Sequence, residues 1–85
     1  MPAPVTETRV SWFRIFNDLK VRGWSVYRIE EHLDVAKSTM LGWKAGAEPR
    51  HADGELLIVL WIQVTGEARD ALPLERRYPS GHSRW

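Results

Sequence analysis

Residues 25–43 constrain the fold most, because two short amphipathic runs meet there at a tight turn. The apolar positions of these runs recur mainly at steps of three and four residues, as on one face of a helix: Val26, Ile29 and Leu33, then Val35, Met40 and Trp43. Ser25 precedes the first run and can accept a hydrogen bond from an amide of the first helical turn. Asp34 lies between the runs and tolerates left-handed backbone better than most residue types. The pattern predicts helices over residues 25–33 and 36–45, joined as in a helix-turn-helix.

An earlier helix is predicted from Thr8, a suitable N-cap residue, to about Arg22. Its core face carries apolar residues at steps of three and four: Trp12, Ile15, Phe16 and Leu19. Gly23 suits the left-handed position that follows a helix end. Residues 1–7 contain two prolines and predict a disordered lead-in.

Residues 56–64, LLIVLWIQV, are ambiguous, because an unbroken apolar run with β-branched residues is also typical of a buried strand. Three flanking residues favour a helix. Asp53 can cap its start, Glu55 suits the first turn, and Gly66 can end it. No partner strand is evident elsewhere in the sequence, so we expect a helix here.

This last helix is apolar on nearly every side, which is typical of a helix that is buried all round. One broad side carries Leu56, Leu57, Leu60, Trp61 and Val64. Ile58, Val59 and Ile62 lie on the other side, which the core of so small a domain is not expected to cover. We expect these three residues to form a homodimer interface, unless Tyr78 or Trp85 folds back to cover them.

The remaining residues complete the predicted fold. Residues 67–74 predict a turn or two of helix broken before Pro73, and residues 75–85 predict a flexible tail. The expected fold class is all-α, a compact four- to five-helix bundle containing a helix-turn-helix, with flexible termini. Its folded domain is expected to span residues 8–74, between the lead-in at 1–7 and the tail at 75–85.

Composition argues against several classes of function. The 85 residues are enough for one domain, and the lack of cysteine excludes disulfides and thiolate metal sites. The three histidines lack metal-ligand spacing, and neither a Gly-rich phosphate loop nor a nucleophile elbow is present. We therefore expect no catalysis, no metal, no cofactor and no small-molecule substrate. The sequence shows no secretory signal, and its apolar runs are too short to cross a bilayer, so we expect a cytoplasmic protein without a membrane partner.

The segment VYRIEEHLDVAKSTMLGWKAG resembles the helix-turn-helix of the lambdoid repressor and Cro class of phage regulators. Ser38-Thr39-Met40 and Trp43 match the recognition helix of that class, and Gly46 matches its closing glycine. The following GAEPRHADGELLIVLWIQVTG is similar to the fourth helix of small phage-type regulators, so that the resemblance covers roughly residues 10–66.

Two positions depart from the pattern of this class. Glu30 stands where the family usually has alanine, at the contact between the two helices, and Asp34 stands where it usually has the glycine of the turn. The Asp34 departure is mild. Glu30 predicts a wider helix crossing, or a side chain whose stem lies along the seam between the helices with its carboxylate in water.

The resemblance implies a sequence-specific regulator of transcription, a repressor-like phage or prophage protein that binds double-stranded DNA in the bacterial cytoplasm or nucleoid. It implies a homodimer on a palindromic site. The residues expected to contact bases are Lys37, Ser38, Thr39 and Leu41. The residues expected to contact phosphates are Ser25, Arg28, Lys44, Arg50 and His51.

Two alternatives stay open from the sequence. One is a DNA-recognition module of a phage packaging or recombination complex, which uses similar small domains. The other is a protein-interaction module that inhibits a host factor and has lost its DNA-binding face. The second alternative stays open because the net charge is only +1 and because Ala36, Leu41 and Gly42 offer no polar contact to bases. The basic residues around residues 36–45 argue against it.

Overall fold

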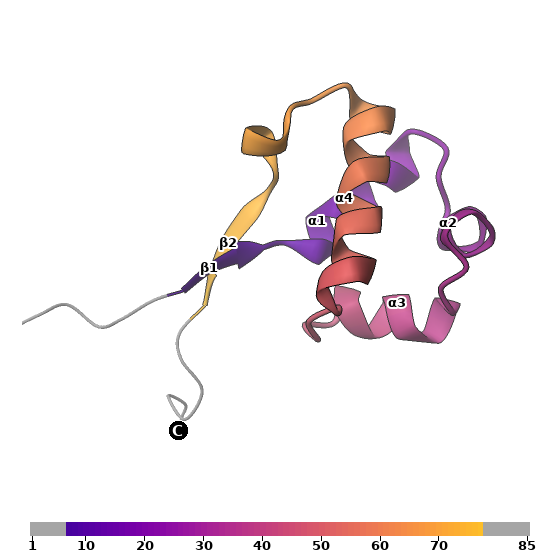
Figure 1. The fold of residues 1–85 in the computed structure, drawn as a ribbon, viewed down its shortest axis with the longest axis horizontal. Coiled ribbons are helices and arrows are strands. Elements are labelled where there is room, and N and C mark those ends of the chain that lie inside the picture. Colours follow the sequence, from indigo (N-terminus) through magenta and orange to yellow (C-terminus); the bar gives the residue numbers. More distant parts are fainter. Residues whose placement is uncertain (1–6, 78–85) are drawn as a thin grey trace, which may run out of the picture.

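Residues 7–77 are described by the computed structural model, and helices account for most of them (Figure 1). In chain order the elements are β1 (Glu7–Val10), α1 (Trp12–Val21), α2 (Val26–Leu33), α3 (Lys37–Lys44), α4 (His51–Thr65), the 3-10 helix η1 (Arg69–Ala71) and β2 (Leu74–Arg77). The predicted predominance of helix is confirmed. The all-α prediction is wrong in one respect, because β1 and β2 form a small antiparallel sheet.

The sheet joins the two ends of the described chain, with Val10 paired to Leu74. The pairing continues beyond β1, where the backbone N–H of Ser11 donates to the carbonyl of Pro73 at 2.9 Å. Thr8 lies within β1 and therefore does not cap a helix. Glu7 and residues 75–77, assigned from the sequence to the lead-in and the tail, belong to the strands. Local patterns miss this pairing because its partners lie more than sixty residues apart.

Ser11 begins α1 in place of Thr8. Its hydroxyl oxygen accepts a hydrogen bond from the backbone N–H of Arg14 at 3.4 Å, which satisfies one of the free amides of the first turn. The end of α1 follows the prediction, because Gly23 adopts left-handed backbone with φ of 90°. The predicted core face of α1 is also confirmed, since each of its four apolar residues is buried: Trp12, Ile15, Phe16 and Leu19.

Helix α4 packs against α1 and is longer than predicted (Figure 1). It begins at His51, with Arg50 rather than Asp53 at the N-cap position, and Asp53 lies in its first turn. Gly66 ends it in left-handed backbone, as predicted. At Gly54 the helix comes so close to α1 that an added Cβ would lie 3.1 Å from the Trp12 ring, so any larger residue there would force the ring to shift.

The predicted division of α4 into two sides is partly wrong. Ile58 is only 6% exposed and belongs to the core, whereas Leu56 is 47% exposed. Val59 is 44% exposed, as predicted, and Ile62 is half-buried against the core. Val10, the last residue of β1, and Leu72, which shortly precedes β2, also pack against this core. The strands and the residues beside them thus add apolar side chains around the core, which the helical pattern alone could not reveal.

Two tryptophans link the core helices to polar partners. The Trp61 indole N–H donates to Asp18 of α1 at 3.0 Å, and the Trp12 indole N–H donates to Glu48 at 2.9 Å. Arg9 of β1 reaches the same loop, with its guanidinium 3.6 Å from Glu48 and donating to the carbonyl of Gly46 at 3.2 Å. The contacts of Trp12 and Arg9 hold the loop between α3 and α4 against α1 and the sheet, and the Trp61 contact joins α4 to α1.

Residues 67–74 contain one turn of 3-10 helix, η1, before Pro73, which agrees with the predicted turn or two of helix broken before that proline, whereas Leu74 belongs to β2. Arg69 of η1 donates two hydrogen bonds to the Glu55 carboxylate of α4, at 3.0 and 3.1 Å. The predictions for residues 1–6 and for the tail beyond residue 77, including Tyr78 and Trp85, lie outside the described residues. Among residues 7–77, no helix combines the length and apolarity needed to cross a bilayer.

Candidate nucleic-acid interface

Helices α2 and α3 pack against each other and are joined by only three residues, Asp34 to Ala36. Asp34 has φ of 57° and ψ of 43°, so the left-handed turn predicted there is confirmed. Ser25 caps α2, because its hydroxyl accepts from the backbone N–H of Arg28 at 3.2 Å. Figure 1 views α2 nearly end-on while α3 runs across the view, so the two helices cross steeply. The crossing leaves one long side of α3 free of α2.

The start of α3 is capped by α2. Ala36 has no side chain that could accept a hydrogen bond, as expected from the sequence. The Glu30 carboxylate instead accepts from the backbone N–H of Lys37 at 3.0 Å. Neither alternative predicted for Glu30, a wider helix crossing or a carboxylate in water, included this hydrogen bond. A negative charge at this helix start also suits the helix dipole.

Lys37 is also held by its side chain. Its ammonium donates to the Tyr27 hydroxyl oxygen at 2.7 Å and lies 4.2 Å from the centroid of the Tyr27 ring. Lys37 is half-buried as a result, and less free than the sequence suggested. Tyr27 itself remains 65% exposed, so the pair lies at the surface rather than beneath α2.

The other residues expected to contact bases are exposed on α3. Ser38 and Thr39 are exposed, and Leu41 is 45% exposed. Met40 and Trp43 are buried on the opposite side, which confirms the predicted core face of α3. Because these two anchors fix the rotation of α3, the structure brings Lys37, Ser38, Thr39 and Leu41 together in its first turn and a half.

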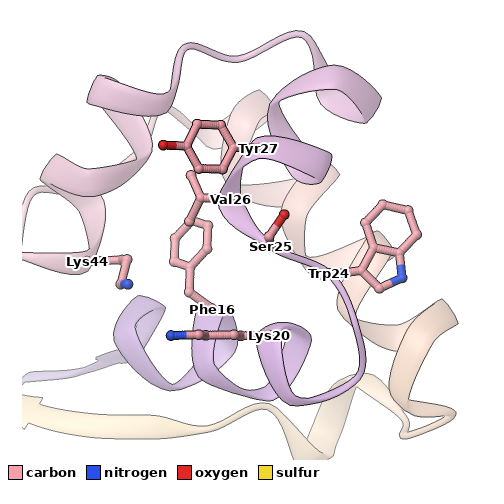
Figure 2. A pocket seen from close by; sticks show the side chains of 7 residues that line it. All are labelled: Phe16, Lys20, Trp24, Ser25, Val26, Tyr27 and Lys44. Carbon is pink, nitrogen blue, oxygen red and sulfur yellow. The ribbon is translucent and has the colours of Figure 1, made fainter.

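Lys44, at the other end of α3, borders a hollow of about 210 Å³ formed with α1 and the start of α2 (Figure 2). The hollow is lined by Phe16, Lys20, Trp24, Ser25, Val26, Tyr27 and Lys44. In Figure 2 the ends of Lys20 and Lys44 lie on one side of Phe16, and Trp24 lies on the other. Its lining carries two ammonium groups and no carboxylate. Ser25 and Lys44, both expected to contact phosphates, therefore share one positively charged hollow.

Arg28 is directed elsewhere. Its guanidinium carbon lies 3.9 Å from the centroid of the Trp24 ring, and it donates to the Gly23 carbonyl at 3.2 Å. The His32 ring forms a T-shaped pair with the same tryptophan, with ring centroids 5.2 Å apart. Arg28, Trp24 and His32 form a shallow open hollow with Glu31. Arg28 is thus held against the segment that joins α1 to α2, in a different hollow from Lys44.

Arg50 and His51 lie at the start of α4, after the loop that follows α3. Both are exposed. The Arg50 side chain is 90% exposed, with its guanidinium 3.5 Å from the Asp53 carboxylate. An ion pair so open to water is weak and does not prevent Arg50 from contacting a phosphate.

Sequence reasoning missed Tyr27 and Lys20. Tyr27 is three residues before Glu30, so the two share a face of α2, and this spacing was the available signal. Lys20 was not among the residues expected to contact DNA, and the hollow beside it depends on how α1 meets α3. Within residues 7–77, no three His, Cys, Asp or Glu side chains gather in a way that could hold a metal ion.

Comparisons with known proteins add nothing to this geometry: no family model, no curated protein and no solved structure matches the chain.

Proposed function

We propose that this protein binds double-stranded DNA in a sequence-specific manner, as a regulator of transcription, with α2 and α3 acting as a helix-turn-helix. The observation that carries the proposal is the two-sided character of α3. Buried Met40 and Trp43 anchor one side, while Ser38, Thr39 and Leu41 are exposed on the other. An exposed first turn on an anchored second helix is the arrangement by which this motif reaches base edges in the major groove.

The proposed base contacts differ in chemistry. Lys37 can donate to guanine O6 and N7, and Ser38 and Thr39 can donate to or accept from either kind of base pair. Leu41 offers no hydrogen bond, but an exposed apolar side chain can contact the methyl group of thymine. Together these residues provide both polar and apolar means of discrimination along one side of α3.

Lys44, Arg50 and His51 are proposed to position the protein through phosphate contacts, with Ser25 beside Lys44 in the charged hollow. Phosphate contacts carry no sequence information of their own. Arg28 joins this group only if its guanidinium leaves the Trp24 ring on binding. The net charge of +1 makes the placement of these few cations more important than their sum.

A selection from random duplexes, repeated at two salt concentrations, tests the proposal with a matched pair of lysine variants. The parent is expected to select a defined sequence. Lys37→Ala should weaken the free energy of binding to that sequence by about 1–3 kcal/mol and relax the preference at one base pair. Lys44→Ala should weaken all sequences alike and lower the salt slope of log K by about one. A parent that enriches no sequence would refute the proposal and favour the protein-interaction alternative.

The proposal includes a homodimer on a palindromic site, because a single short helix reads only a few base pairs. On the outer side of α4, Leu56 and Val59 are exposed and three residues apart, with Ile62 half-buried nearby on the helix. These residues replace the set that included Ile58. A two-fold axis through such an interface is expected to separate the two α3 helices by about 34 Å, one turn of DNA.

Sedimentation of the parent and of a Leu56→Glu/Val59→Glu variant tests the dimer. We expect the parent to sediment as a dimer at tens of micromolar and the folded variant as a monomer. A monomeric parent without DNA would contradict the dimer, and a dimeric variant would exclude this side of α4 as the interface.

A further inference from the structure

The first residue of α3 is held by α2 at two points. The Glu30 carboxylate accepts from the Lys37 backbone N–H at 3.0 Å, and the Tyr27 hydroxyl oxygen accepts from the Lys37 ammonium at 2.7 Å. Tyr27 and Glu30 lie on the same face of α2 because they are three residues apart. We propose that Tyr27 and Lys37 form one base-reading unit that prefers guanine in the major groove, with Tyr27 as a specificity-determining residue. This inference rests on the DNA-binding function proposed above.

The preference for guanine follows from counting hydrogen-bond donors. A lysine ammonium has three donors, and Lys37 uses one on Tyr27, so two remain. The Tyr27 oxygen accepts from Lys37, so its own O–H is free to donate. The unit therefore presents the free N–H groups of Lys37 and the O–H of Tyr27 to the groove, all of them donors, and no carbonyl or carboxylate acceptor. Guanine offers two adjacent acceptors, O6 and N7, whereas adenine offers one acceptor beside a donor.

The exposure of the two side chains suits this role. Tyr27 is 65% exposed and borders the hollow beside Lys44 but lies outside the buried core, so core packing does not explain its position. Lys37 is half-buried, and its ammonium lies 4.2 Å from the Tyr27 ring centroid. A lysine restrained before binding loses less side-chain entropy when it meets a base. The restraint also limits the number of neighbouring bases that the ammonium can reach, which sharpens selectivity.

The test compares the parent with Tyr27→Phe and Tyr27→Ala in duplex selection and in titrations at several salt concentrations. Phe13→Ala is the matched control, since Phe13 is an exposed aromatic residue of α1. We expect the parent to require guanine at one position. Tyr27→Ala should reduce the preference for that guanine about tenfold and leave the salt slope unchanged, because no charge is lost. The guanine preference of Tyr27→Phe should lie between those of the parent and of Tyr27→Ala, because this variant keeps the ring but loses the hydroxyl.

A second measurement examines the unit without DNA. The Lys37 ammonium lies 4.2 Å from the Tyr27 ring centroid, so ring-current shielding should shift the protons of the adjoining Cε upfield in NMR spectra of the parent and of Tyr27→Phe. The shift should disappear in Tyr27→Ala, whose unchanged amide spectrum outside α2 and α3 would show that it folds. A parent without the upfield shift would overturn the unit whatever the protein binds.

The DNA measurements separate failure of this inference from failure of the proposed function. A parent that selects no duplex refutes the function and the unit together. A selective parent whose guanine preference survives in Tyr27→Ala refutes the unit alone. Equal weakening of all sequences by Tyr27→Ala would also refute the unit, because it would make Tyr27 a phosphate contact.

Discussion

The pair α1 and α4 contrasts with the pair α2 and α3. Most of the buried core comes from α1 and α4, whereas α2 buries only Ile29 and α3 buries Met40 and Trp43. In Figure 1, α2 and α3 lie at the end of the molecule away from the sheet. One small domain thus combines two parts. Helices α1 and α4 form a packed support, and α2 and α3 turn their polar sides outward.

The polar contacts of the two pairs differ in the same way. In the support, buried Trp12 and Trp61 direct their indole N–H groups to carboxylates, so each contact fixes an aromatic core residue. Between α2 and α3, Glu30 and Tyr27 hold the backbone and side chain of Lys37 near the surface. Contacts of the first kind are expected to determine stability, and contacts of the second kind to determine how α3 is presented.

The largest effect is expected from Leu57→Ala in the support. Leu57 is fully buried, so the substitution should lower the free energy of unfolding by about 2–5 kcal/mol through lost burial and an unfilled cavity. Leu56→Ala is the matched control. The neighbouring Leu56 is 47% exposed, so its replacement should lower the free energy of unfolding much less. Urea unfolding measures both. Equal losses would show that the division of α4 into a buried and an outer side is wrong.

A smaller effect is expected from Glu30→Ala, which removes the acceptor at the start of α3. Loss of a helix cap typically costs about 0.5–2 kcal/mol. Glu31→Ala is the control, because Glu31 is the adjacent exposed carboxylate on the same helix. Hydrogen exchange should become faster at the first amides of α3 in the Glu30 variant and not in the control. Unchanged hydrogen exchange in both variants would show that Glu30 does not stabilise the start of α3.

The smallest effect concerns the exposed contact between Glu55 of α4 and Arg69. Hydrogen bonds from Arg69 lower the pKa of Glu55 below its ordinary value of 4.5. A carboxylate with a lowered pKa in the folded state contributes stability above its unfolded pKa and loses it as the pH falls through the folded pKa. The parent should therefore lose slightly more stability than Arg69→Ala on acidification below about pH 4.5, as followed by thermal unfolding. Parallel curves would show that this contact contributes nothing measurable.

The helices could be predicted because their signals are local. Apolar spacing, Ser25, Asp34 and the helix-ending glycines all act within a few residues of where they lie. The sheet could not be predicted in this way, because Val10 and Leu74 are brought together only by the complete fold. The burial of Ile58 was also missed, because the helical pattern of α4 alone does not show which of its sides the neighbouring elements cover.

The candidate site was predictable to a similar degree. The exposure of Ser38, Thr39 and Leu41 follows from the helical period of α3 once Met40 and Trp43 are placed in the core. The partners of Lys37 do not follow from that period, because they lie on a different helix. Placing Lys20 beside the hollow likewise required the packing of α1 against α3.

The central claim, that α3 is presented to DNA by the other helices, is tested most directly by mapping amide shifts in labelled protein titrated with its selected duplex. The account predicts the largest changes at Ser38, Thr39 and Leu41, with changes at Tyr27 on α2. It predicts small changes in the strands and at Leu57 in the core. Changes concentrated on the sheet or on the outer side of α4, with α3 unaffected, would contradict the account.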